Sequence, residues 1–258
     1  MFSRHGTTIF AGLLLAALTA LADARAVSSL GRIEPLDGVY RLAGPSELAV
    51  VSELRVKEGD RVQRGQVLAT LDTHALLLAQ VKRAEVGVDH ARRVLTRNEA
   101  LKQGAFQSQA ALDEAERDLE LRLAELVAAR AQLDRASVKA PVAGQVLIIH
   151  ARQGERIGPN GLLELGQTEH MYAVAEVYET DIALVSPGQS ARVTSPALSS
   201  PARGTVERIG MMVAKNDALG LDPVARTDSR IVEVFVLLDD PTAVASLTNL
   251  QVSVEIGE

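Results

Sequence analysis

The sequence has no cysteine and no tryptophan, and it contains only five histidines among 258 residues. The lack of cysteine excludes disulfides, zinc-thiolate sites, iron-sulfur clusters, thiol nucleophiles and a lipid anchor on cysteine. The histidines stand at positions 5, 74, 90, 150 and 170, and no two of them have the spacing of metal ligands. A Gly-x-Ser-x-Gly motif is also missing. We therefore expect no catalytic, cofactor-binding or metal-binding residue, and we predict that the chain is not an enzyme.

Aromatic residues and blocks of basic residues are both scarce. Phe and Tyr make up 3% of the chain, the formal net charge is -6 and the pI is about 5.5. The sequence thus offers few aromatic side chains for base stacking and no basic footprint, so we expect no nucleic acid as a partner. Hydrophobic residues make up 47% of the chain, and this is enough for one or two packed domains.

The N-terminus has the pattern of a targeting signal. Arg4 and His5 precede an apolar run over residues 9–22, which is followed by Ala-Asp-Ala and Ala-Arg-Ala. This order is typical of a secretory signal peptide, and the run is shorter than the ~20 residues that cross a bilayer. We predict that residues 1–26 are a signal peptide cleaved after Ala24 or Ala26, with retention as a short anchor as the alternative. In both cases the rest of the chain is exported.

A short pattern occurs twice in the chain. Lys-Glu-Gly-Asp-Arg-Val at 57–62 returns as Arg-Gln-Gly-Glu-Arg-Ile at 152–157, and each copy is soon followed by another glycine, Gly65 or Gly161. Glycine at these points suits turns with positive φ, and the flanking Val, Ile and Leu alternate as in half-buried strands. We predict two similar β units, each of which covers the apolar face of the other in a sandwich.

Between the two copies the hydrophobic period lengthens to about 3.5 residues, which is typical of a coiled coil. One stripe runs from Leu77 to Asn98 in steps of four and three, and a second places leucines at 112, 119, 126 and 133. The region has no proline, and its first half is mainly basic while its second half is mainly acidic. We predict an antiparallel helical hairpin over residues 74–135 that protrudes roughly 40 Å, with its tip near Gly104. Two helices packed flat on the β units are the alternative.

Short strand patterns return in the last third of the chain. Strands are predicted at 172–177, 190–194, 204–209, 231–238 and 252–256, and together they indicate a small β-barrel. A short helix is predicted at 181–185 with Thr180 as its cap. The polar stretch 215–229 is predicted to be a loop.

The order of these parts resembles the HlyD-type membrane fusion proteins, the periplasmic adaptors of Gram-negative export pumps. Residues 56–72 and 138–146 look like the two lipoyl-type halves of that family. Four further motifs are closer still to the DevB branch, which serves ABC exporters; they lie at 31–35, 174–181, 204–210 and 247–250. The resemblance covers nearly the whole chain after the signal.

The resemblance implies a fold class that is mostly β with an α-helical coiled-coil hairpin. A lipoyl-type β-sandwich is split by the hairpin and followed by a small β-barrel. The expected parts are a signal or anchor, a membrane-proximal or barrel strand segment, the first lipoyl-type half, the hairpin, the second half and the β-barrel with membrane-proximal strands, at 1–26, 27–48, 49–73, 74–135, 136–168 and 169–258.

The same resemblance implies a non-enzymatic adaptor in the periplasm that is associated with the inner membrane. Such an adaptor bridges an inner-membrane ABC permease and ATPase to a TolC-type outer-membrane channel, without a cofactor. It forms a homo-oligomeric ring, commonly a hexamer, in which the hairpins build a tube. The hairpin predicted here is shorter than that branch would suggest.

Two sets of site residues follow from the resemblance. Arg97, Leu101 and Ser108 reproduce the Arg-x3-Leu-x6-Ser spacing with which the family docks to TolC-type channels. Alternatively, these residues are a solvated charge, the end of the hydrophobic seam and a helix cap. Gln153 and Gly154 lie in a turn that resembles the family's loop pointing into the central channel of the ring; the alternative is a turn that tolerates substitution.

Three other functions remain open at this point. A biotinyl or lipoyl carrier domain would need an exposed lysine at the tight turn between its halves, where this chain has a predicted helical hairpin. A secreted hydrolase would have to assemble its site from His90, His150 or His170, which are scattered along the chain. The short hairpin also leaves room for an adaptor that works with the inner-membrane pump alone.

Overall fold

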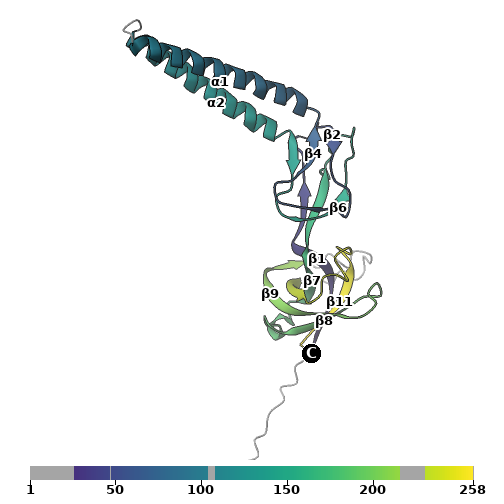
Figure 1. The fold of residues 1–258 in the computed structure, drawn as a ribbon. Coiled ribbons are helices and arrows are strands. Elements are labelled where there is room, and N and C mark those ends of the chain that lie inside the picture. The colour runs from purple at the N-terminus through teal and green to yellow at the C-terminus, as the bar shows by residue number, and fades with distance from the viewer. Residues whose placement is uncertain (1–25, 47, 104–107, 216–229, 258) are drawn as a thin grey trace, which may run out of the picture.

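The computed structural model describes residues 26–46, 48–103, 108–215 and 230–257. A helical hairpin, a β-sandwich and a β-barrel follow one another along the long axis of the molecule (Figure 1). The fold class predicted from the sequence is confirmed. The predicted signal at 1–26 and the predicted loop at 215–229 fall almost entirely outside the described residues. Within the described ranges, no helix has the length and apolar character needed to cross a membrane.

The barrel is a closed ring of six strands. They are β1 (Val27–Leu42), β11 (Gln251–Ile256), β8 (Ser190–Thr194), β9 (Ala202–Lys215), β10 (Arg230–Leu238) and β7 (Leu163–Tyr178). The strands pair in this order, and β7 pairs antiparallel with β1 to complete the circle. Burial alternates along β10 from Val232 to Leu238, because every second side chain points into the barrel. The closure leaves no free strand edge between these six strands.

The sandwich has two facing sheets. One contains β2 (Val51–Leu54), β4 (Val67–Leu71) and β5 (Ser137–Lys139). The other is formed by β3 (Arg61–Val62) and β6 (Gly144–Ile149) together with the adjoining ends of β7 and β1. Leu68 and Leu71 from the first half of the repeat pack in one core with Leu163 and Leu165 from the second half. Each half therefore buries the apolar face of the other, as the repeat predicts.

The repeat also recurs in the conformation of its turns. Gly59 and Gly154 have φ of 89° and 86°, and the glycines that follow them, Gly65 and Gly161, have φ of 81° and 80°. Glycine is the residue that reaches this region at the least cost. In each first turn an acidic side chain accepts a hydrogen bond of 2.8 Å from the backbone N–H three residues earlier. The two halves thus share their turn chemistry.

Strands β1 and β7 run through both the barrel and the sandwich. Their pairing shifts register twice between Pro35 and Val39, where Asp37 and Gly38 have φ of 60° and 74°. This irregularity marks the passage from barrel to sandwich. The sequence pattern predicts only the part of β7 at 172–177, because the small and polar residues before Met171 hide its continuity. The expected division at 168/169 consequently falls inside a single strand.

The hairpin consists of α1 (His74–Gln103) and α2 (Gln109–Asp134), joined to the sandwich through β4 and β5. Val81, Val88 and Leu126 are buried between the helices, with Leu119 and Leu133 packed against them. Glu85 and Arg130 form an ion pair of 2.8 Å across the seam. Figure 1 shows the two helices extending away from the β domains. The predicted protruding hairpin is correct, and the alternative with helices flat on the β units is wrong.

The prediction of a short helix at 181–185 is wrong. The structure has a single 3-10 turn, η1 (Ile182–Leu184), whose N-cap residue is Asp181 rather than Thr180, and no side chain caps it. Val185 returns to extended backbone with φ of -98° and ψ of 134°. Ser186 precedes Pro187, and a residue before proline disfavours helical backbone. The chain therefore leaves the helical conformation after one turn.

Candidate functional site

The far end of the hairpin carries the three residues whose spacing predicts a docking site. Arg97 and Leu101 lie on α1 one turn apart, and both are exposed to solvent. Leu101 has 40% of its surface accessible, which makes it an exposed apolar side chain close to the tip. Ser108 immediately precedes α2 and follows residues 104–107, which lie outside the described ranges.

Ser108 caps α2. Its backbone is extended, with φ of -81° and ψ of 155°, and its Oγ accepts a hydrogen bond of 3.3 Å from the N–H of Ala111. This satisfies one of the free N–H groups at the start of the helix. The hydroxyl proton is still available as a donor. A role as a cap and a role in contacting a partner are thus compatible in this residue.

Other polar contacts hold the two helices together behind the tip. Lys102 on α1 bonds to Gln109 on α2, and Gln109 Nε2 donates to Asp113 Oδ1 at 2.6 Å. Asn98 Nδ2 donates to the carbonyl of Ala111 over 3.4 Å. The sequence analysis did not identify Lys102 and Gln109, although the four-residue spacing of Gln109 and Asp113 indicates a pair on one helix face. The contacts of Lys102 and Asn98 join α1 to α2 close to Arg97 and Leu101.

The tip has the chemistry of a small docking surface. Leu101 offers apolar area, Arg97 offers guanidinium donors and Ser108 offers one hydroxyl donor. A groove between two helices with accessible carbonyl oxygens would match this set. Among the described residues, no group of three or more His, Asp or Glu side chains could hold a metal ion.

The second set of predicted residues lies in the turn before Ile157. Gly154 donates its N–H to the carbonyl of Val51 at 2.8 Å, so the backbone of the turn is fixed to β2. Gln153 is exposed. The corresponding residue in the first half of the repeat is Glu58, whose carboxylate accepts a hydrogen bond of 2.9 Å from the N–H of Ile149. Within the described part of the chain, the side chain of Gln153 makes no such bond, so its amide is free to contact something else.

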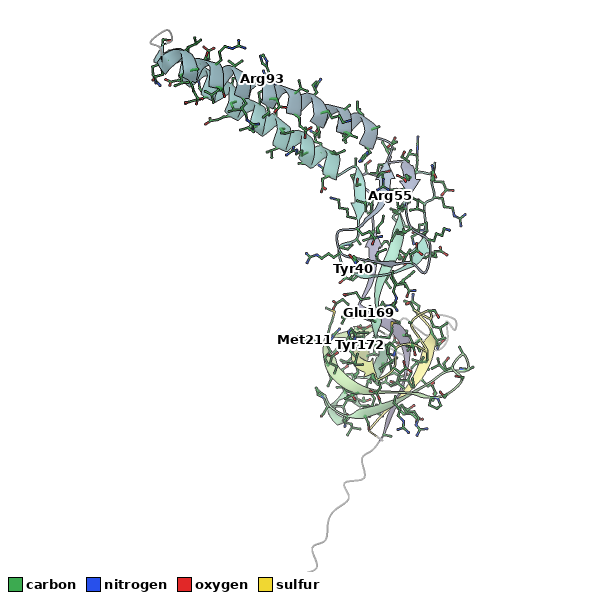
Figure 2. All side chains as sticks on the ribbon, viewed as in Figure 1. Tyr40, Arg55, Arg93, Glu169, Tyr172 and Met211 are labelled. Atoms are coloured by element: carbon green, nitrogen blue, oxygen red, sulfur yellow. The ribbon has the colours of Figure 1, made fainter. Side chains whose placement is uncertain are left out.

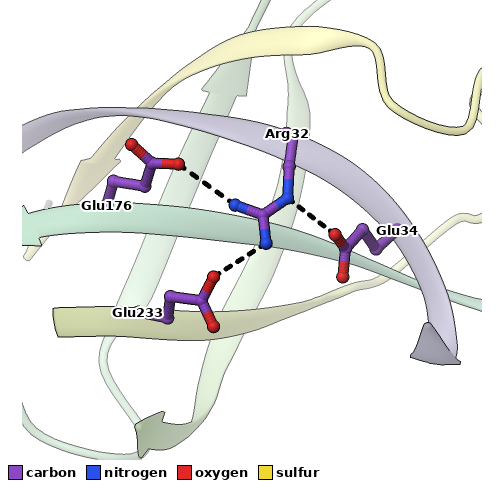
Figure 3. Close-up of polar contacts among 4 residues, drawn as sticks. All are labelled: Arg32, Glu34, Glu176 and Glu233. Carbon is purple, nitrogen blue, oxygen red and sulfur yellow. Dashed lines mark hydrogen bonds and ion pairs between the residues drawn. The ribbon is translucent and has the colours of Figure 1, made fainter. Parts of the chain in front are cut away.

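An ionic cluster of one arginine and three glutamates lies on the outer face of the barrel, and the sequence analysis did not identify it. Arg32 on β1 bonds to Glu34 at 2.6 Å, to Glu233 on β10 at 2.7 Å and to Glu176 on β7 at 3.1 Å (Figure 3). Burial opposes the charge of Arg32, but the hydrogen bonds to Glu233 and Glu34 outweigh it and raise the pKa of the guanidinium. The cluster joins three neighbouring strands, so we assign it a structural role.

A β-bulge builds a second polar cluster on the barrel. Phe235 faces Arg208 and Val236 faces Val206, so Glu207 is the extra residue on β9. The bulge lets Glu207 accept a hydrogen bond from Tyr172 (labelled in Figure 2) while Arg208 stacks on the ring of Phe235. Burial and the neighbouring Glu207 raise the pKa of Tyr172 to about 12.

Comparison with known proteins agrees with this architecture. Residues 44–163 match the family model of the CzcB-like barrel-sandwich hybrid domain. Among solved structures, a MacA-MexA chimeric protein with the Pseudomonas aeruginosa MexA α-hairpin domain superposes with a TM-score of 0.70. The alignment has 16% identity and covers 90% of this chain and 80% of the other. The chain has the membrane fusion protein fold.

Two further structures have the same fold. The membrane fusion protein Spr0693 from Streptococcus pneumoniae R6 is 18% identical with a TM-score of 0.67, over 89% of this chain and 98% of that one. ZneB from Cupriavidus metallidurans is 23% identical with a TM-score of 0.52, over 90% and 98%. The comparison with curated protein sequences finds no match. The resemblance to membrane fusion proteins is thus confirmed at the level of the fold.

Proposed function

We propose that the chain is a non-enzymatic adaptor subunit of an export system in the periplasm. It bridges an inner-membrane ABC permease and ATPase to a TolC-type outer-membrane channel, and several copies form a ring. The observation that carries this proposal is the separation of two exposed ends along one molecule. The barrel begins where the chain emerges from the predicted signal, and the hairpin ends in the Arg97–Leu101–Ser108 surface.

The carrier-domain alternative does not fit this arrangement. The connection between β4 and β5, where a carrier would present its modified lysine on a tight turn, is the entire helical hairpin. A hydrolase is also poorly supported. His150 bonds to Glu164 at 3.2 Å, while His90 lies on α1 and His170 on β7, so the three histidines belong to different parts of the molecule.

The test of the proposal is export by cells that carry a Leu101→Asp variant. A charge placed in an apolar contact has no partner there, and its desolvation costs about 2 kcal/mol or more. Export and crosslinking from position 97 to the channel should both be lost. Arg97→Ala should weaken export less, because a charge at the rim of an interface contributes more to orientation than to affinity.

Leu123→Asp is the matched control. Leu123 is 39% exposed on α2, almost the same as Leu101, but it lies along the hairpin rather than at its tip. This variant should export normally. If Leu101→Asp keeps full export and channel association, the tip does not dock, and the remaining interpretation is an adaptor that acts with the inner-membrane pump alone.

A further inference from the structure

The outer face of the barrel carries a cavity of about 370 Å³ beside the passage to the sandwich. Its walls come from β1, β7, β10 and β9, which are neighbours in the barrel. Figure 2 shows one lining residue, Tyr172, in the part of the barrel that lies toward the sandwich. The volume falls within the range of sites that bind small molecules. Neither set of residues predicted from the sequence lines this cavity.

Part of the cavity wall is apolar. Val174 and Tyr172 are buried side chains, and the rings of Tyr172 and Phe235 meet edge to face with their centroids 6.4 Å apart. The hydroxyl of Tyr172 already donates to Glu207, so the tyrosine contributes its ring rather than a polar group. The cavity therefore offers a surface for the apolar part of a ligand.

Three charged residues line the cavity, namely Glu34, Asp37 and Arg208. Glu34 is already paired with Arg32 at 2.6 Å (Figure 3). Arg208 places its guanidinium over the ring of Phe235, with Cζ 3.2 Å from the centroid. Among the described residues, Arg208 makes no hydrogen bond and no ion pair, so its N–H donors are available to a ligand. One positive charge and one negative charge, those of Arg208 and Asp37, thus remain for binding.

Asp37 is held at the edge of the cavity by the irregular part of β1. Its φ of 60° lies in the left-handed region, which residues other than glycine seldom adopt. Gln167 donates to Oδ2 of Asp37 at 3.2 Å, and Oδ1 has no donor in the part of the chain that the structure describes. Burial raises the pKa of Tyr172, and Asp37 adds to this rise while Arg208 opposes it. Both charges are therefore close enough to act on the same phenol.

The spacing of these two charges limits the ligand. The guanidinium of Arg208 lies over β10 and Asp37 belongs to β1, with β7 between them. Two strand spacings put the charged groups roughly 10 Å apart. A ligand that forms a hydrogen bond of about 2.9 Å at each end then carries its own charges about 4 Å or more apart. One residue reaches at most about 3.5 Å and two residues about 7 Å, so a dipeptide fits and a single amino acid is too short.

We propose that this cavity binds a short zwitterionic peptide of about two residues. Its terminal carboxylate lies at Arg208, because a planar guanidinium with free N–H groups suits a carboxylate. Its terminal ammonium lies at Asp37, whose Oδ1 accepts the hydrogen bond, and an apolar side chain packs on Val174 and Tyr172. The inference goes beyond the proposed function, because none of these residues belongs to the hairpin tip or to the turn of Gln153.

Calorimetric titration of the purified protein with the dipeptide L-alanyl-L-phenylalanine tests the proposal. For a ligand of this size we expect a Kd on the order of 0.1–1 mM. The N-acetylated dipeptide lacks the ammonium and the C-terminal amide lacks the carboxylate, so each should bind about tenfold more weakly. L-phenylalanine cannot reach both charges and should also bind more weakly. The absence of saturable binding up to about 10 mM, or equal binding of the blocked dipeptides, overturns the proposal, and equal binding of phenylalanine contradicts a peptide ligand.

Two substitutions assign the ends of the peptide. Asp37→Asn keeps a residue that tolerates the left-handed backbone, and it should weaken the free dipeptide about tenfold while leaving the N-acetylated form unchanged. Arg208→Gln should in the same way affect the free dipeptide and not the C-terminal amide. Arg203→Gln is the matched control, because Arg203 is also an exposed arginine on β9 but does not line the cavity. Equal losses for the free and blocked dipeptides would contradict the assigned contacts.

The result separates from that of the proposed function. Titration uses the purified protein alone, whereas bridging is measured by export in cells. Peptide binding in a chain that supports no export leaves the cavity standing and removes the bridging function. Normal export without peptide binding removes the peptide site and leaves the function. The comparison of free and blocked dipeptides is made on the parent protein, so it does not depend on the folding of any variant.

Discussion

At the scale of single residues, the glycines differ in how much space surrounds them. A Cβ added to Gly31 would lie 2.5 Å from the carbonyl oxygen of Val174, which is backbone of the paired strand and has nowhere to move. A Cβ on Gly87, in the interior of α1, would lie 3.6 Å from the Arg122 side chain, an ordinary contact. The two sites therefore respond in opposite directions to the same substitution.

Gly31→Ala should lower the free energy of unfolding by more than about 1 kcal/mol, because β1 and β7 must separate to admit the methyl group. Gly87→Ala should leave the fold intact and stabilise the hairpin by about 0.5–1 kcal/mol through its better helix propensity. Urea unfolding of the two variants and the parent measures both effects. Equal destabilisation by both would contradict the close approach at Gly31.

At the scale of elements, the hairpin seam depends on few apolar residues. Leu126 is buried against Val81 and Val88, and Leu119 packs against this cluster. Replacing Leu119 and Leu126 with Asp should separate the helices, because two charges would be buried without partners. The barrel and sandwich cores contain none of these residues and should stay folded.

Limited proteolysis measures this difference. The first cuts in the Leu119→Asp, Leu126→Asp variant should fall between about residue 80 and residue 130, while the β domains resist. The hairpin's exposed residues Leu121 and Val127 provide the matched control: Asp at these two positions should leave the proteolysis pattern of the isolated chain unchanged. Collapse of the whole protein in the seam variant would show that the β domains depend on the hairpin.

The helices could be predicted from the sequence because their signal is local. Leucines seven residues apart and the lack of proline determine α2 without reference to the rest of the chain. The continuity of β1 and β7 could not be predicted in this way, because it depends on pairing between residues such as Gly31 and Ala175 that are far apart in sequence. The ionic cluster of Arg32 could not be predicted for the same reason, because its partners Glu176 and Glu233 lie on strands that are distant in the sequence.

At the scale of the whole molecule, the internal repeat is symmetric in fold but not in its contacts. Glu58 in the first half bonds to the backbone of Ile149 and so ties the two halves together. Its counterpart Gln153 is exposed, and the turn around it is fixed by the backbone bond of Gly154 and by Glu155. The side-chain amide of Gln153 is therefore exposed in each copy. In a ring of copies, these amides would recur around the axis.

We predict that Gln153→Ala changes the passage of solute through the assembled exporter without changing the stability of the chain. The turn keeps its backbone bonds, so the free energy of unfolding should stay within about 0.5 kcal/mol of the parent. In the proposed ring, with this turn at its axis, the Gln153 amides would form a narrow hydrogen-bonded constriction, and their loss should raise leakage through the resting conduit. Gln63→Ala is the control, because Gln63 is also exposed in a turn of the sandwich and is not in the turn of Gln153. Unchanged export and unchanged leakage in Gln153→Ala would show that Gln153 is only a turn residue, whereas equal leakage in both variants would point to a general effect on the sandwich.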